Sequence, residues 1–187
     1  MRTLNYLLSV LFIGITMIGC ASSTGGGGDV PDWFLTPPDD PNFWYAPNSQ
    51  VSADMQLALD KAVQGGRTEI GRKAEVLIQG LQKRFTEETG TVGNSQLLDM
   101  FTQASKTVVN TSLSGSRIAK QKIMKEGNGW RGYALVEYAV GAAREAMMQQ
   151  IKNNEQLYTR FRQTQTFKEL DEEVKKFDEF KKNQKQQ

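Results

Sequence analysis

Apolar side chains recur at every third or fourth position between residues 55 and 85, and this spacing predicts one long amphipathic helix. Ser52, just before the run, is a preferred N-cap residue, and Asp54 would place a negative charge in the first turn. The recurring positions are Met55, Leu59, Ala62, Val63, Ile70, Ala74, Leu77, Leu81 and Phe85.

Small residues form a second pattern on the same predicted helix, at spacings of four. Gly65 and Gly66 together cost about 2 kcal/mol relative to alanine in a helix interior, so close packing or a local bend must offset them. A stripe of small side chains would let the helix approach a sheet, or a second copy of itself, closely. Its members are Ala58, Ala62, Gly66, Ile70 and Ala74.

A second helix and a hairpin are predicted after a turn at residues 89–93. Asn94 or Ser95 would cap the second helix. Residues 113–126 form a predicted strand of mixed polarity, and residues 130–139 a strand rich in aromatic and branched side chains. The sequence Glu126-Gly127-Asn128-Gly129 between them is typical of a tight turn. The apolar side of the helix comprises Leu97, Leu98, Phe101, Ala104, Val108 and Val109.

Two more helical segments are predicted near the C-terminus. The first runs from Gly141 to about Tyr158, and residues 161–187 form a charged helical tail with opposite charges at i,i+4. The apolar seam of this tail covers about two heptads, fewer than the three or four expected for a coiled coil. This favours a docked or frayed helix over a dimer zipper. The seam consists of Phe167, Leu170, Val174 and Phe177.

The lead-in at residues 31–47 holds all five prolines and a dense group of aromatic residues. Proline fixes φ and removes a donor, so residues 31–41 are expected to be extended and irregular, with a short strand at residues 43–46. The aromatic side chains either lie across the domain and cover its core, or form an intermolecular contact. Trp33, Phe34 and Trp44 are therefore the candidate interface residues.

The order of these elements predicts an α+β fold. A small antiparallel sheet (strand–long helix–helix–strand–strand) would pack on helices, with a C-terminal helical extension. We expect residues 31–160 to form one domain, followed by the tail at 161–187.

The first 19 residues have the layout of an export signal. Arg2 supplies positive charge, and the apolar run at residues 7–18 is shorter than the 20 or so residues that a membrane-spanning helix needs. The run ends in Met17-Ile18-Gly19-Cys20, which resembles the signal of bacterial lipoproteins. Gly19-Cys20 matches the strict half of that motif, and Met17-Ile18 matches the loose half less closely.

This resemblance implies that residues 1–19 are removed, that Cys20 is lipidated, and that the lipid holds the chain on a membrane. The alternative is an ordinary signal in which Cys20 is an incidental thiol. Residues 20–30 contain four consecutive glycines and are expected to form a flexible linker. Ala21 stands where inner-membrane lipoproteins often carry Asp, so the resemblance implies the outer membrane.

The amino-acid composition argues against several classes of partner and catalytic site. The chain has 23 Lys and Arg against 21 Asp and Glu, which argues against a nucleic-acid partner. It has no histidine, which excludes His-based triads and His metal ligands, and its one cysteine is assigned to lipid. Asp29, Asp32, Asp39 and Asp40 lack the spacing of a calcium loop. We therefore expect no catalytic residue, no metal, no cofactor and no enzyme activity.

Over residues 31–140 the chain resembles the Lpp-twenty lipoprotein family of bacterial envelopes. The resemblance implies a strand–helix–strand–strand fold; some relatives build rings or disks beneath the outer membrane around flagella, and others are surface antigens. Gly65, Gly66 and Gly71 depart from the family pattern, and the extension after residue 140 lies outside it, so flagellar association is not carried over. The matching residues are Pro31-Asp32-Trp33-Phe34, Ala58, Ala62, Arg67, Ile70, Leu113-Ser114-Gly115 and Tyr133-Ala134-Leu135-Val136.

Two functional classes follow from the sequence. The first is a lipid-anchored envelope lipoprotein with a structural or interaction role, which assembles with copies of itself or with an envelope partner. The alternative is a small-ligand-binding lipoprotein with an aromatic-lined site between subunits, where Trp130 and Tyr133 would serve as stacking surfaces.

Overall fold

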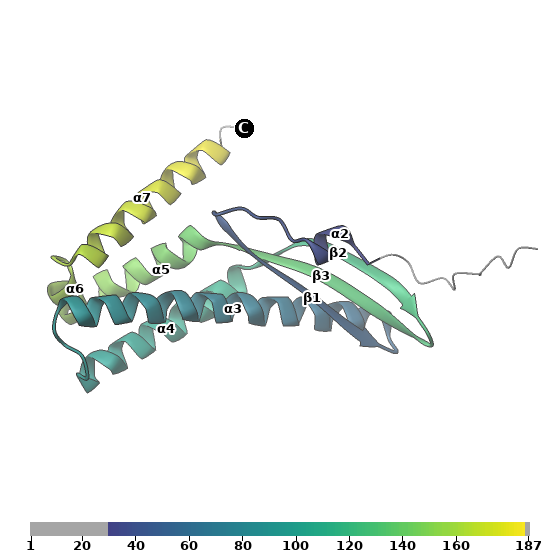
Figure 1. Ribbon diagram of the computed structural model, residues 1–187, viewed down its shortest axis with the longest axis horizontal. Coiled ribbons are helices and arrows are strands. Elements are labelled where there is room, and N and C mark those ends of the chain that lie inside the picture. Colours follow the sequence, from purple (N-terminus) through teal and green to yellow (C-terminus); the bar gives the residue numbers. More distant parts are fainter. Residues whose placement is uncertain (1–29, 186–187) are drawn as a thin grey trace, which may run out of the picture.

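The computed structural model describes residues 30–185 and has the expected α+β fold. A three-stranded antiparallel sheet with strand order β1-β3-β2 occupies one end of an elongated molecule, and helices occupy the other (Figure 1). The elements are α2 (Asp32–Leu35), β1 (Phe43–Ser52), α3 (Met55–Glu88), α4 (Ser95–Gly115), β2 (Arg117–Glu126), β3 (Gly129–Ala139), α5 (Val140–Asn153), α6 (Glu155–Phe161) and α7 (Gln165–Gln184).

The long helix α3 packs closely on β1 and β3. A Cβ atom built on Gly66 would lie 2.6 Å from Cγ2 of Val136 and 3.0 Å from the carbonyl oxygen of Ala46. A Cβ built on Gly132 of β3 would lie 2.7 Å from the backbone of Ala58. All members of the small-residue stripe are buried. Contact with the sheet of the same chain therefore accounts for Gly66, and this close packing offsets its cost in the helix.

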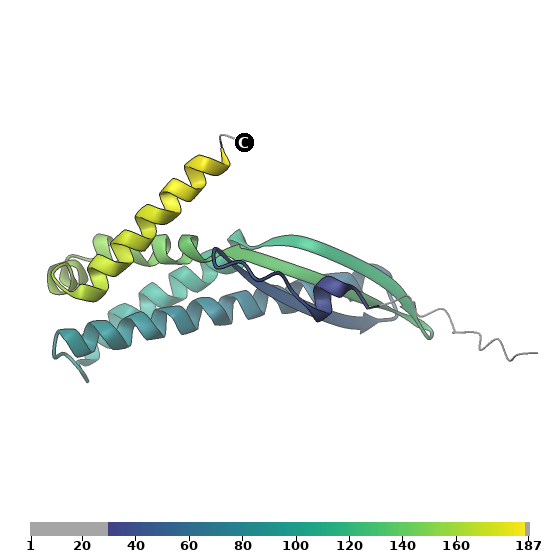
Figure 2. The same cartoon turned by 45° about the horizontal axis from the view of Figure 1, so that its top comes forward.

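The second half of α3 extends past the sheet and forms a helical core with α4, α5 and α6. Three fully buried phenylalanines, Phe85, Phe101 and Phe161, meet at its centre with ring centroids 4.5 to 6.0 Å apart. Figure 2 shows this helical end beside the sheet end, with α3 running through both. Because α3 belongs to both parts, the two cores form one connected unit.

The lead-in and the first strand differ from the expectation in two ways. The lead-in is not irregular throughout, because Asp32–Leu35 forms a helical turn after Pro31, whose φ of −62° suits that position. The strand expected at residues 43–46 continues to Ser52, so Ser52 belongs to β1 and does not cap α3. Asp54 is the cap instead, and its side chain accepts a hydrogen bond from the Leu57 amide at 2.7 Å.

Two helix boundaries also differ. Residues 113–115 are helical, so the strand expected from 113 begins only at Arg117. The helix expected through Tyr158 breaks at Asn154, whose side chain accepts a hydrogen bond from the Leu157 amide at 3.0 Å and caps α6. At the second helix, by contrast, the expected cap Asn94 is confirmed, with a bond from the Leu97 amide at 3.0 Å.

The charged tail forms α7, which docks on its own chain. Phe167 and Leu170 are buried, and Phe177 packs directly against Gly141 at the start of α5. The carboxylate of Glu88, at the end of α3, accepts hydrogen bonds from the amides of Gln165 (2.6 Å) and Thr166 (3.1 Å) and from the Thr166 hydroxyl. Glu88 therefore caps the N-terminus of α7 together with the N-cap residue Thr164, whose hydroxyl accepts a hydrogen bond from the Phe167 amide at 3.2 Å. Negative charge at this position is also favourable for the helix dipole.

We predict that Gly132→Ala destabilises the fold and that Gly80→Ala does not. The added methyl group at Gly132 would collide with the backbone of α3, and overpacking of this kind costs about 1–3 kcal/mol. Gly80 has open space at its Cβ position in the same helix, so alanine there is expected to add about 0.5–1 kcal/mol of stability. Urea unfolding followed by tryptophan fluorescence measures both. Equal stability of the two variants would contradict the proposed close contact.

We also predict that acid loosens α7. The hydrogen bond from the Thr166 hydroxyl, together with the backbone amides of Gln165 and Thr166, lowers the pKa of Glu88 against the opposing effect of burial. A lowered folded-state pKa means that the contribution is complete above the ordinary value of 4.5 and is lost as the pH falls through the folded-state value.

Hydrogen exchange over residues 165–184 tests this contribution. Near neutral pH, Glu88→Gln should exchange faster than the parent chain, and the difference should disappear in acid. Glu87→Gln is the matched control, because Glu87 is exposed and faces Lys83 rather than α7. If the two variants exchange alike near neutral pH, Glu88 does not hold the helix.

Candidate interaction surface

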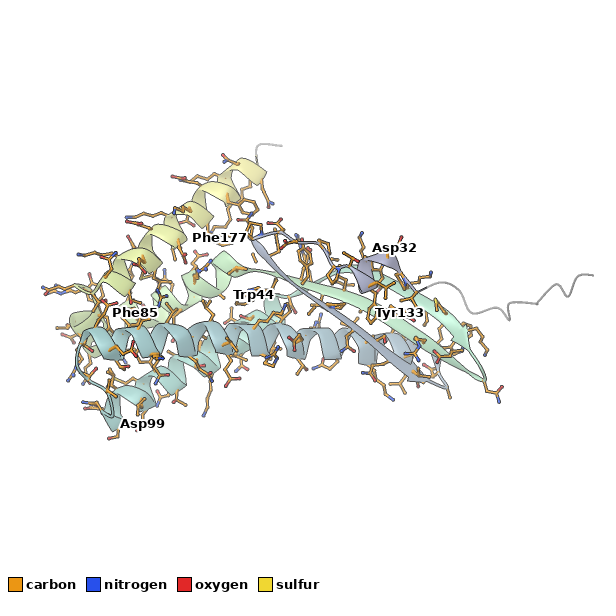
Figure 3. All side chains as sticks on the ribbon, in the orientation of Figure 1. Asp32, Trp44, Phe85, Asp99, Tyr133 and Phe177 are labelled. Atoms are coloured by element: carbon orange, nitrogen blue, oxygen red, sulfur yellow. The ribbon has the colours of Figure 1, made fainter. Side chains whose placement is uncertain are left out.

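The sequence-predicted interface residues lie on two different faces of the sheet. Trp33 and Phe34 belong to α2, with ring centroids 6.5 Å apart, and Phe34 meets Tyr133 of β3 edge to face at 5.0 Å. Trp44 stacks on Tyr138, with ring centroids 6.4 Å apart. Tyr138 is five residues after Tyr133 on β3, and side chains an odd number of residues apart on a strand point to opposite faces, so Trp44 lies on the opposite face from Phe34. Figure 3 shows Trp44 and Tyr133 at different places along the sheet. The structure therefore brings Trp33 and Phe34 together and places Trp44 against the core.

The lead-in covers part of the sheet and also leaves apolar surface exposed. Tyr133 is buried with Phe34 against it, and Phe34 itself is half-buried, which agrees with the interpretation that these aromatics cover the core. Leu35, next in α2, is 68% exposed. The intermolecular role of Trp33, Phe34 and Trp44 stays a prediction. Cys20 lies outside the described residues.

The proposed stacking residues offer little open ring surface. Tyr133 is only 4% exposed and has Phe34 against it. The ammonium group of Lys125 lies 4.6 Å from the ring centroid of Trp130, on the same face as α3. A flat ligand on either residue would have to displace one of these contacts.

The outer edge of β2 is open among residues 30–185. Eight of the ten residues of this strand are exposed, because α3 lies over β1 and β3. In an antiparallel sheet, the N–H and C=O of one residue point to the same side. The register therefore directs the backbone groups of Gln121, Ile123 and Lys125 away from β3, while those of Lys120 and Lys122 face it. A β-bulge between Ile118 and Lys120 ends the regular edge.

The opposite edge of the sheet, on β1, is blocked. Lys73 of α3 donates a hydrogen bond from Nζ to the outward-facing carbonyl of Tyr45 at 2.9 Å. Pro47, two residues on, faces the same way and has no N–H to donate. Within residues 30–185, β2 thus supplies the one edge with regular unblocked donors and acceptors.

A groove runs beside the open edge, between α3 and β2. Its volume is about 470 Å³, and its walls include Leu59, Val63, Arg67, Ile118 and Gln121. Nε of Arg67 is buried without a hydrogen-bond partner, the only such side-chain nitrogen or oxygen in the described chain. We call the open edge of residues 120–126 together with this groove the β2 edge surface.

The strand of the β2 edge surface carries an excess of positive charge, and the groove beside it holds both Arg67 and Asp60 of α3. Strand β2 carries four cations, Arg117, Lys120, Lys122 and Lys125, against the single anion Glu126. Arg117 is paired with Glu137 of β3 at 2.6 Å, so the excess of positive charge along the regular edge comes from the lysines. Arg131 of β3 donates to Glu126 at 2.7 Å, and this bond lowers the pKa of the Glu126 carboxyl, which therefore stays ionised. Glu126 is thus compensated from β3 and does not offset the cations of β2.

Sequence reasoning missed this surface. The only local signal was the mixed polarity of residues 117–126, which lack the alternation of a strand with one buried face. That signal predicts exposure on both faces. It does not identify the neighbouring helix residues, such as Arg67, that form the groove.

We predict that Arg67→Met leaves the free energy of unfolding unchanged or raises it by about 1 kcal/mol, because a buried donor without a partner costs about 1–3 kcal/mol. Arg144→Met is the control, since Arg144 pairs with Glu173 of α7 at 2.5 Å and its loss should lower stability. Urea titration measures both variants. A clear loss of stability in Arg67→Met would mean that Nε has a partner in solution.

Other kinds of site find no support in the described chain. Among residues 30–185, no group of three or more acidic, histidine or cysteine side chains is placed to hold a metal ion. No helix in this part is both long enough and apolar enough to cross a bilayer. Comparisons of the chain with protein-family models, with curated proteins and with solved structures found no match.

Proposed function

We propose that the chain is a lipid-anchored lipoprotein of the bacterial envelope that acts by binding, either to copies of itself or to an envelope partner. The observation that carries this proposal is Gly19-Cys20 at the end of a short apolar run that follows a positive start. With no second cysteine, Cys20 has no disulfide partner within the chain. Ala21, in place of the Asp of many inner-membrane lipoproteins, favours attachment to the outer membrane.

The binding role is supported by the open edge of β2. Exposed strand edges pair readily with other chains, and proteins usually protect them. In this fold β1 is protected by Lys73 and Pro47, whereas β2 keeps its regular edge open from residue 120 to 126. No catalytic group is needed for such a role. The small-ligand alternative gains no specific support, since the Tyr133 ring is covered by Phe34.

We predict that the chain recovered from a bacterial host begins at Cys20 and carries added fatty mass. The full-length gene is expressed, the membrane fraction is extracted with detergent, and the intact mass and N-terminal peptide are measured. Cys20→Ser is the control, because a hydroxyl cannot take the place of the thiol that accepts the lipid.

The control protein should carry no lipid and should retain residues 1–19 or leave the membrane fraction. A parent protein that starts at another residue, or that lacks added fatty mass, would refute the anchor.

A further inference from the structure

We infer that the β2 edge surface binds an extended acidic segment of a partner protein, which adds to the sheet as a fourth strand beside β2. The inference rests on the proposed function in one respect, since that function supplies a protein partner. The contact itself requires only the described domain.

The backbone of β2 supplies the first requirement for strand addition. Gln121, Ile123 and Lys125 direct their N–H and C=O groups to the open edge and can bond an incoming strand in regular register. The β-bulge at Ile118/Lys120 limits this register at one end, and the turn at Gly127 limits it at the other. The site therefore accepts a short extended segment.

The side chains beside the edge define the sequence pattern of the segment. Alternate residues of an added strand would point toward the groove, where Leu59, Val63 and Ile118 offer apolar contacts among polar neighbours. Apolar side chains of moderate size fit these contacts. The intervening residues would lie on the other face of the sheet, beside Lys120, where carboxylates are favoured. An alternation of acidic and apolar residues fits both faces at once.

Arg67 adds a further preference for acceptors. Arg67 lines the groove, and its buried Nε has no hydrogen-bond partner among residues 30–185. An arginine in the groove wall favours a carbonyl or carboxylate oxygen on the bound segment, because its N–H groups can only donate hydrogen bonds.

A second copy of this chain fits the site poorly. Pairing β2 with β2 would bring together two strands in which lysines outnumber acidic residues, and like charges across a strand pair are destabilising. Pairing β2 with β1 of another copy would meet the edge that Lys73 and Pro47 block. Charge complementarity therefore favours a different, acidic chain.

The test uses the full chain in detergent and a blocked fluorescent peptide in which glutamate and valine alternate. Binding is followed by fluorescence anisotropy at low salt. One control peptide has the same residues with all glutamates grouped in one half, and a second carries N-methyl groups on alternate amides, which removes the donors on one edge. We expect the alternating peptide to bind at least about tenfold more tightly than either control, since each lost backbone bond costs up to about tenfold.

Two matched variants locate the site. Gln121→Pro removes the N–H that faces the open edge and leaves the bonds between β2 and β3 intact, while Gln121→Ala changes the side chain alone. We expect Gln121→Pro to weaken peptide binding at least about tenfold and Gln121→Ala to have little effect, provided that the two variants show the same circular dichroism. Lys120→Glu should weaken binding of the acidic peptide and reduce its dependence on salt.

Several outcomes would overturn the inference. Equal binding of the alternating and grouped peptides would indicate attraction of charge without strand pairing, as on an anionic lipid surface. Binding that survives in Gln121→Pro would place the peptide elsewhere, and no binding at all would remove the proposed ligand. An oligomer of the parent chain that Gln121→Pro dissociates in sedimentation would show that another copy fills the edge. None of these results depends on the mass of Cys20, so this inference and the lipid anchor fail separately.

Discussion

The close contact of α3 with β1 and β3 is the constraint on which the rest of the fold depends. Gly66 and Gly132 allow this contact, because a side chain at either position would meet atoms of the opposite element at less than 3 Å. A helix held this near to a sheet can cover only a narrow strip of it. The strip is centred on β1 and β3, and β2 is consequently left outside.

The same contact explains why the two edges of the sheet differ. Helix α3 runs close enough to β1 for Lys73 to reach the carbonyl of Tyr45, so the helix itself protects that edge. At β2 the helix stands further away, and the space between them is the groove lined by Arg67 and Ile118. The protected edge, the open edge and the groove are thus three consequences of one helix position.

The elements that the sequence predicted well are those whose signals are local. The periodicity of residues 55–85 comes from burial of one helix face, and the turn at Gly127 needs a positive φ, which is 55° here. The residues at which helices and strands begin and end were harder to predict. Ser52 and Asp54 are both good caps, and the choice between them depends on how far β1 pairs with β3, which is decided by residues about 80 positions away.

The candidate site was less predictable than the fold for the same reason. Trp33 and Phe34 stood out by residue type, and the structure places them together, but Trp44 belongs to the core face because of its position in the β1 register. In the β2 edge surface, Arg67 of α3 and Gln121 of β2 line the same groove although they are far apart in the sequence. No spacing in the sequence encodes that juxtaposition, although the exposure of β2 follows from its polarity.

The position of the lead-in connects the proposed anchor with the proposed binding surface. Residue 30 precedes α2, which lies on the sheet through Phe34 and Tyr133, so the chain enters the domain at the sheet and not at the distant helical end (Figure 1). Residues 20–30 span at most about 35 Å when fully extended. Lipid on Cys20 would therefore keep the sheet end nearer the membrane, within reach of segments of other proteins that emerge from the same surface. Helix α7 begins at the other end of α3, where Glu88 accepts its first amides, and its second half returns to the sheet, where Phe180 meets Phe43 of β1 at 6.1 Å.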